Sequence, residues 1–190
     1  MRLNVPNLLT WGRIILIPLL LVVYYLPERW MPEHGQNMIA AGIFGLAAIT
    51  DWLDGYLARS LKQTSAFGAF LDPVADKLMV ATALLLLVGL DKVPVFIAAI
   101  IIGREIAISA LREWMAKLGE SRSVAVSFVG KLKTTAQMCA ILLLLYNDPV
   151  WAIDTHLIGT WLIYIAAVLT LWSMAYYLRK ALPLVREAMK

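Results

Sequence analysis

The sequence contains one cysteine and two histidines among its 190 residues. The single thiol, Cys139, excludes an internal disulfide, and no cysteine or histidine lies near it at metal-site spacing. We interpret it as a small apolar packing residue. His34 and His156 fall in segments that we expect to be loops, far from the acidic residues described below. A metal site in this chain would therefore use oxygen ligands.

The sequence also shows no internal repeats or low-complexity tracts, and we expect no cleavable signal peptide. Its start has no basic region followed by a small-residue cleavage site, and the first apolar run is too long for a signal peptide. We expect that run to remain as a spanning helix. The length allows one compact domain, which we assign to residues 1–190.

Apolar residues are abundant instead. They make up 61% of the chain, and the mean hydropathy is +0.75, against about 45–50% apolar residues in soluble domains. Most apolar segments approach the ~20 residues that cross ~30 Å of hydrocarbon. The fifth is short, so we expect its helix to begin earlier, near Ser123. The sequence predicts an all-α, polytopic membrane protein with six transmembrane helices at about residues 8–26, 38–57, 68–90, 93–115, 134–146 and 157–178.

Basic residues are distributed unevenly among the connections between these segments. One side of the membrane would hold only Arg29 and Lys92, and the other would hold most remaining lysines and arginines. By the positive-inside rule, both termini are predicted to be cytoplasmic. We attribute the formal charge of +4 to this topology, so no nucleic-acid partner is expected.

An acidic stretch, residues 51–76, is predicted to lie at the cytoplasmic end of the helices. Asp51 and Asp54 are three residues apart, and Gly68, Asp72 and Asp76 are spaced by four, so each set shares one helix face. The short connection makes the two helices antiparallel neighbours. The carboxylates of one helix are therefore expected to face those of the other.

Facing carboxylates repel one another unless they are protonated, paired with cations or bound to a metal. Carboxylate oxygens without nearby histidine or cysteine suit Mg²⁺ or Mn²⁺, and such ions often bind phosphate oxygens. Gly55 and Gly68 would let a ligand approach the backbone closely, and Arg59 suits a phosphate. The alternative is that these residues are solvated charges at helix ends.

The pattern D-x-x-D-G-x-x-A-R-x8-G-x3-D-x3-D resembles the signature of the CDP-alcohol phosphotransferases, and every fixed position is filled. That family displaces CMP from a CDP-linked substrate by attack of an alcohol. The resemblance implies a six-helix membrane fold, an active site at its cytoplasmic end and Mg²⁺ (or Mn²⁺) as cofactor. It implies Asp76 as the catalytic base. The metal ligands that it implies are Asp51, Asp54, Asp72 and Asp76, and the cytidine-diphosphate contacts are Gly55, Arg59, Thr64 and Gly68.

The opening segment, Pro6 to Arg13, is also similar to the start of that family. On a helix Asn7 and Thr10 share one side, with Arg13 close to it. The similarity implies that Asn7 and Thr10 contribute to the binding site for the CDP-linked donor. The alternative is that Asn7 caps the first helix and that Arg13 only reports topology.

Four basic residues in the second half of the chain could form a separate phosphate pocket: Arg104, Arg112, Lys131 and Lys133. Arg104 lies well inside an apolar segment, so it needs a partner such as Glu105 or an anionic ligand. Guanidinium forks and lysine ammonium groups both suit phosphate. The alternative is that these residues bind anionic lipid headgroups at the cytoplasmic face.

The segments 72–77, 104–105, 109–114 and 130–137 resemble the bacterial members of the family that join CDP-diacylglycerol to sn-glycerol 3-phosphate, and the likeness covers nearly the whole chain. This similarity implies those two substrates, a role in anionic phospholipid biosynthesis, the bacterial inner membrane as location and a homodimer. The near alternatives are relatives that form cardiolipin or use inositol phosphate. A cation transporter and a non-catalytic scaffold are the distant ones. A transporter site is expected near the bilayer midplane, whereas these carboxylates map to the cytoplasmic edge.

Overall fold

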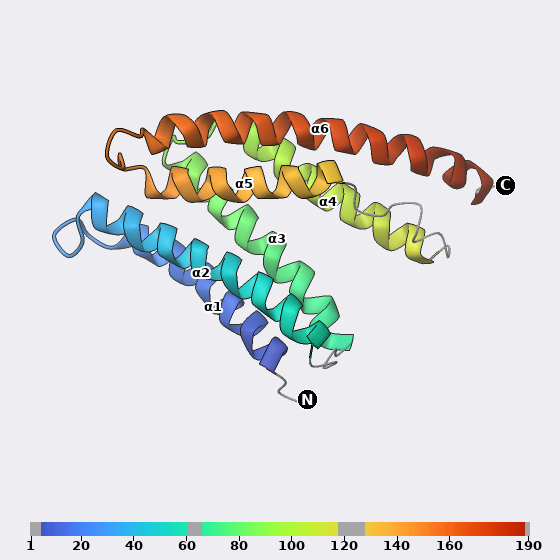
Figure 1. The fold of residues 1–190 in the computed structure, drawn as a ribbon, viewed down its shortest axis with the longest axis horizontal. Coiled ribbons are helices and arrows are strands. Elements are labelled where there is room, and N and C mark those ends of the chain that lie inside the picture. The colour runs from blue at the N-terminus through green and yellow to red at the C-terminus, as the bar shows by residue number, and fades with distance from the viewer. Residues whose placement is uncertain (1–4, 61–65, 118–127, 189–190) are drawn as a thin grey trace.

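The computed structural model describes residues 5–60, 66–117 and 128–188, with side chains described except at 5–7, 54–60, 66, 67, 69, 128–131, 180 and 183–188. These residues form six helices and no named strand, which confirms the all-α prediction for the described part of the chain (Figure 1). The helices are α1 (Val5–Tyr25), α2 (Glu33–Ser60), α3 (Ala66–Gly89), α4 (Val95–Lys117), α5 (Phe128–Tyr146) and α6 (Thr155–Ala188).

Several helices extend beyond the apolar segments that predict them. Helix α5 begins at Phe128 in the described residues, which confirms that the fifth helix starts before Thr134. Helix α6 contains 34 residues. Its start is fixed by Asp154, whose carboxylate accepts a hydrogen bond from the backbone N–H of Leu157 at 3.0 Å, as an N-cap residue does. Hydropathy marks the apolar part of a helix, whereas caps and polar turns set its ends.

Helices that follow one another in the chain run antiparallel, and the bundle packs around one large apolar core (Figure 1). Helix α1 contacts α2 and α3, α6 contacts α4 and α5, and contacts of α2 with α5 and of α3 with α4 join the two groups (Figure 1). Fully buried Phe44, Leu84, Ile101 and Ile141 belong to the central core. A smaller apolar cluster lies between α4 and α6; its buried members are Ile108, Met115, Tyr177 and Ala181.

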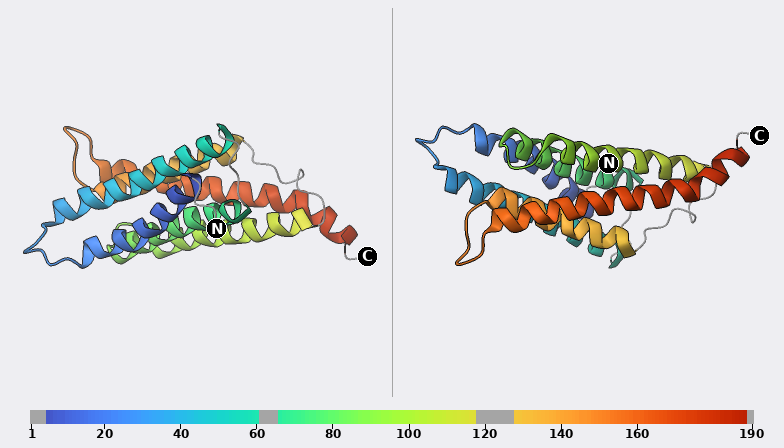
Figure 2. Two further views of the ribbon diagram at one scale, coloured as in Figure 1. Left: turned by 90° about the horizontal axis from the view of Figure 1, so that it is seen from below. Right: turned by 90° about the horizontal axis from the view of Figure 1, so that it is seen from above.

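The connections 26–32, 90–94 and 147–154 lie at one end of the bundle, opposite the C-terminal end of α6 (Figures 1 and 2). Polar contacts join them. His34 and His156 lie in the first turns of α2 and α6, so the prediction that they belong to loops is wrong. His34 is exposed, and its Nδ1 lies 2.9 Å from Asp148 Oδ2. Lys92 Nζ and the Tyr24 hydroxyl each donate to Asn37 Oδ1 at 3.1 Å. Burial lowers the pKa of Lys92, while the charges of Glu33 and Asp148 act in the opposite direction.

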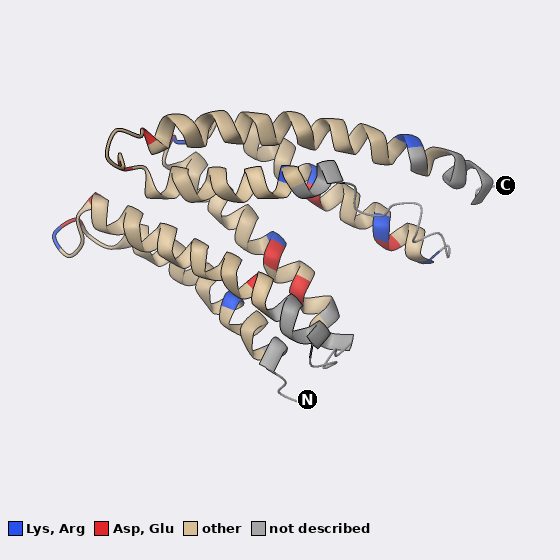
Figure 3. Cartoon of the chain, in the orientation of Figure 1, with Lys and Arg blue, Asp and Glu red and all other residues tan. Residues whose placement is uncertain are grey.

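Two described helices are long and apolar enough to cross a membrane by length and composition, over Leu8–Tyr25 and Thr155–Arg179. A shorter apolar helix covers Leu132–Tyr146. Large apolar side chains point outward, among them Trp161 and Trp172, which are 67% and 72% exposed. Cys139 is exposed too, so its interpretation as a packing residue inside this bundle is wrong. Figure 3 shows long stretches of the described helices without charged residues. Six membrane spans remain a prediction.

Candidate active site

A buried arginine from α1 lies between acidic residues of α2 and α3. Arg13 Nη1 lies 2.7 Å from Asp51 Oδ1 and 3.1 Å from Asp72 Oδ1. The Arg13 side chain is only 1% exposed, whereas the two aspartate side chains are 42% and 40% exposed. A guanidinium buried among helices needs such partners. Because one nitrogen contacts both carboxylates, the predicted convergence of α2 and α3 is confirmed for Asp51 and Asp72.

Asp76 follows Asp72 by one helical turn and is half-buried in α3. Its carboxylate interacts electrostatically with Asp51, Asp72 and Arg13. The side chain of Asp54, the fourth predicted acidic ligand, is not among those described, although its backbone belongs to α2. Three of the four predicted aspartates are therefore brought together by the described structure.

The donor chemistry of this cluster fits a hard divalent cation. Its described donors are carboxylate oxygens, the ligands that Mg²⁺ and Mn²⁺ prefer. A positive group, the Arg13 guanidinium, already lies between two of these carboxylates. Among the described residues, no group of three or more His, Cys, Asp or Glu is arranged as a metal site. In the described structure, the guanidinium group of Arg13 partly neutralises the charge of Asp51 and Asp72.

The residues predicted to bind the CDP-linked donor lie close to Arg13, Asp51 and Asp72 in the sequence. Thr10 is 3% exposed and lies three residues before Arg13, on the same side of α1. Gly68 lies in the first turn of α3, one turn before Asp72. Asn7, Gly55 and Arg59 belong to α1 and α2 in parts where side chains are not described, and Thr64 lies outside the described residues.

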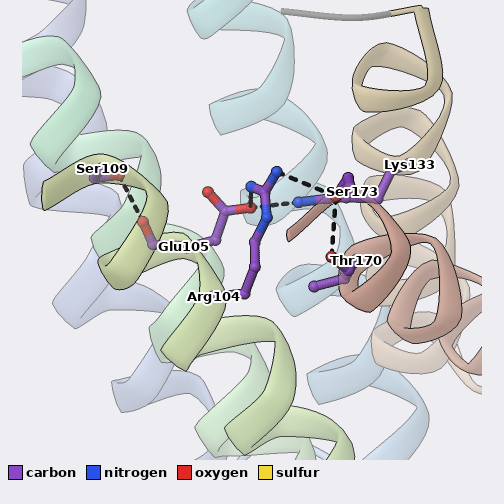
Figure 4. Close-up of polar contacts among 6 residues, drawn as sticks. All are labelled: Arg104, Glu105, Ser109, Lys133, Thr170 and Ser173. Carbon is purple, nitrogen blue, oxygen red and sulfur yellow. Dashed lines mark hydrogen bonds and ion pairs between the residues drawn. The ribbon is translucent and has the colours of Figure 1, made fainter. Parts of the chain in front are cut away.

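A second polar cluster connects α4, α5 and α6 (Figure 4). Arg104 Nη1 lies 3.0 Å from Glu105 Oε1, and Lys133 Nζ donates to the same oxygen. Arg104 Nη2 donates to Ser173 Oγ at 3.3 Å. Arg104 and Lys133 are 7% and 2% exposed. The prediction that Arg104 needs Glu105 as a partner is confirmed. The side chain of Lys131 is not among those described.

Arg112, two turns after Arg104 on α4, packs against an aromatic ring of α6. Its Cζ atom lies 5.3 Å from the centroid of the Tyr177 ring, and Arg104 Cζ lies 5.9 Å from the same centroid. The Nε atoms of both arginines are buried and form no hydrogen bond within the described structure. A buried donor without an acceptor costs about 1–3 kcal/mol. Two such donors beside one ring suit a ligand that carries several anionic oxygens.

The two polar clusters lie close enough to interact. The Asp76 carboxylate interacts electrostatically with Glu105 of the second cluster as well as with the other aspartates. The bundle therefore places a carboxylate-rich site next to a site that is rich in guanidinium and ammonium groups. Such a pair can hold a metal-bound diphosphate and a second phosphate side by side.

Sequence reasoning left one residue of this region open and missed two. Arg13 was assigned either to the donor site or to topology, and its ion pairs with Asp51 and Asp72 were not predicted. Ser173 and Tyr177 lie in an apolar run of α6. Nothing in their spacing distinguishes them from ordinary packing residues.

A family model described as CDP-alcohol phosphatidyltransferase matches residues 3–172 of the chain. The chain belongs to this family. CDP-alcohol phosphatidyltransferases similar to it include proteins named CDP-diacylglycerol--glycerol-3-phosphate 3-phosphatidyltransferase in three enteric bacteria. The protein of Salmonella choleraesuis (strain SC-B67) is 54% identical, and those of Shigella flexneri serotype 5b (strain 8401) and Escherichia coli (strain K12) are 52% identical. Each alignment covers 95% of this chain and 96% of the relative. The predicted family membership is confirmed.

Proposed function

We propose that this protein transfers the phosphatidyl group of CDP-diacylglycerol to sn-glycerol 3-phosphate, giving phosphatidylglycerophosphate and CMP. The observation that carries the proposal is the pairing of Asp51 and Asp72 through Arg13. One turn after Asp72, the Asp76 carboxylate interacts electrostatically with Glu105, which pairs with Arg104 and Lys133. The names of the relatives that are 52–54% identical support the same donor and acceptor.

The acidic cluster is proposed to hold one or more divalent cations, Mg²⁺ or Mn²⁺, through Asp51, Asp54, Asp72 and Asp76. A bound cation supplies charge neutralisation for the diphosphate and for the departing CMP. Arg13 contributes a fixed positive charge to the same carboxylates. Phosphoryl transfer depends mainly on such positioning and charge neutralisation, with little covalent help from the protein.

Asp76 is the proposed general base. Its carboxylate would accept the proton of the attacking hydroxyl group of glycerol 3-phosphate, while the oxygen of that hydroxyl forms the new bond to phosphorus and CMP leaves. The electrostatic interaction of this carboxylate with both the other aspartates and Glu105 supports the role. The donor contacts are proposed to be Asn7, Thr10, Gly55, Arg59, Thr64 and Gly68.

The acceptor phosphate is proposed to bind Arg104, Arg112, Lys131 and Lys133. Of the described charges here, Arg104, Arg112 and Lys133 are positive and Glu105 is negative, so the cluster has a positive excess. A phosphate monoester, which carries about −1.5 to −2 charges at neutral pH, complements that excess. The unpaired Nε atoms of the two arginines would gain acceptors when the phosphate binds.

The protein is proposed to be a single domain with six spans in the bacterial inner membrane and with both termini cytoplasmic. The three short connections at one end of the bundle, including 26–32 with Arg29, would face the outside. The acyl chains of the donor would remain in the bilayer, and its headgroup would reach the polar end, where water-soluble acceptor arrives. A homodimer is proposed from the family resemblance.

The direct test is CMP release from CDP-diacylglycerol by the purified protein with Mg²⁺ and a panel of acceptors. We expect release with glycerol 3-phosphate, and none above background with inositol phosphate or phosphatidylglycerol. Release with one of the other acceptors instead would reassign the acceptor within the family. No release with any acceptor would reject the proposed transfer.

A further inference from the structure

Tyr177 is the one described aromatic residue that contacts two of the cationic side chains at once. Its side chain is buried, 1% exposed, on the face of α6 that packs against α4. The ring lies within cation–π distance of Arg104 and Arg112. These arginines are eight residues apart, which corresponds to about 12 Å along the axis of α4 at 1.5 Å per residue. The ring therefore bridges two guanidinium groups whose residues lie two turns apart on the same helix face.

The two arginines depend on this ring to different degrees. Arg104 also contacts Glu105 and Ser173, so its guanidinium is held from several directions. For Arg112, within the described structure, the Tyr177 ring is the only polar or aromatic anchor that fixes its guanidinium. Its Nε atom is buried without a hydrogen-bond acceptor. A long, mobile side chain loses much rotational freedom when it binds an anion, and a ring that holds the guanidinium in advance reduces that loss.

We propose that Tyr177 is a positioning residue for the acceptor: its ring holds Arg112, together with Arg104, at the spacing that binds the phosphate of the acceptor. The inference rests on the proposed function, because it concerns the phosphate site of that reaction. Tyr177 itself does not touch the reacting atoms. It acts through the guanidinium groups that it orients.

A purely structural role is the alternative that the test has to separate, because Tyr177 also packs against Ile108, Met115 and Ala181. A structural role would lower folding stability or affect both substrates equally. A positioning role would change the Michaelis constant for the acceptor alone, and it would depend on the electron-rich face of the ring and on the presence of Arg112.

The experiment compares steady-state kinetics of the wild-type protein with three variants. Tyr177→Leu removes the ring, Tyr177→Phe retains it, and Tyr164→Leu changes a tyrosine that is 38% exposed elsewhere on α6. We expect Tyr177→Leu to raise the KM for glycerol 3-phosphate about tenfold, the size of a lost desolvated cation–π contact. The kcat and the KM for CDP-diacylglycerol should stay within about twofold, and the other two variants should match the wild type.

Two further measurements keep the proposal testable if Tyr177→Leu folds poorly. Fluorinated phenylalanines at position 177 retain the shape of the ring but weaken its negative face, so the KM for glycerol 3-phosphate should rise with each added fluorine. In an Arg112→Ala background, the same series should have a much smaller effect, because the main partner is gone. A KM that does not respond to fluorination, or a response that is equally large without Arg112, would overturn the proposal.

The outcomes also separate this inference from the proposed function. If the wild-type protein does not use glycerol 3-phosphate, the proposed function itself fails. If the wild-type protein does use it and the ring variants leave the acceptor KM unchanged, only the role of Tyr177 is rejected.

Discussion

Arg13 on α1 and Asp51 on α2 form an ion pair of 2.7 Å, and the same guanidinium nitrogen also contacts Asp72 on α3. Three helices are thus joined through one buried positive charge at the acidic site. In a site proposed for divalent cations, Arg13 offsets the repulsion between carboxylates whether or not a metal is bound. Its removal should therefore affect stability and metal dependence together.

The Arg13→Gln variant should be less stable than the wild type in the absence of divalent metal. The substitution leaves two neighbouring carboxylates without their countercharge. Because these side chains are about 40% exposed, we expect the free energy of unfolding to fall by about 1–3 kcal/mol, less than for a fully buried pair. Mg²⁺ should then stabilise the variant more than the wild type, because bound metal replaces the missing charge. Thermal unfolding in detergent with and without Mg²⁺ measures both effects. Arg29→Gln, at an exposed connection, is the control, and equal unfolding temperatures for Arg13→Gln and wild type would contradict the argument.

The Asp76→Asn variant should lose CMP release while retaining its fold. An amide cannot take the proton from the attacking hydroxyl group, and a general base contributes about 10²–10⁴-fold to rate, so we expect a drop of at least about 10²-fold. CMP release measures the effect, and thermal unfolding checks the fold. The matched control is Asp91→Asn in the connection after α3, where φ is 56° and asparagine is well tolerated. Normal turnover by Asp76→Asn would remove it from the role of base.

Chelation of divalent metal by EDTA should stop CMP release, and added Mg²⁺ or Mn²⁺ should restore it. The reason is that the acidic cluster offers only carboxylate oxygens among its described donors, which suit these ions. Calorimetric titration of the metal-free protein with Mg²⁺ gives a readout that does not depend on turnover, and the binding heat should fall in Asp72→Asn. Undiminished turnover after exhaustive chelation would rule out the metal-dependent mechanism.

The Arg112→Ala variant should mainly raise the KM for glycerol 3-phosphate. Hydrogen bonds to charged groups contribute about 1.5–3 kcal/mol, which corresponds to a rise of roughly 10- to 100-fold. Steady-state kinetics with each substrate varied in turn measures the effect, and the KM for CDP-diacylglycerol should not change. Lys117→Ala is the control, because Lys117 is exposed at the end of α4 and, among the described residues, pairs with Glu113 on the surface. An unchanged acceptor KM in Arg112→Ala would exclude this residue from the phosphate pocket.

The sequence allowed the acidic site to be predicted because helical spacing and a short connection are local properties. Asp51 and Asp72 could be assigned to facing helix surfaces from their spacing and from the hairpin alone. Glu105 could be predicted because a buried Arg104 needs a nearby negative partner. The partners of Arg13 could not be predicted, since its contacts are with residues distant in the chain. Tyr177 could not be found at all, because an aromatic residue in an apolar helix has the pattern of a packing residue.

The length of α6 has a consequence for how a polar substrate reaches the site. Its 34 residues extend about 50 Å at 1.5 Å per residue, well beyond ~30 Å of hydrocarbon. Tyr177 lies 22 residues after the first residue of this helix, at a height of about 33 Å. In a bilayer entered at Thr155, the ring and its two arginines would stand at headgroup depth. A charged, water-soluble acceptor could then dock without leaving an aqueous environment, while the lipid donor stays immersed.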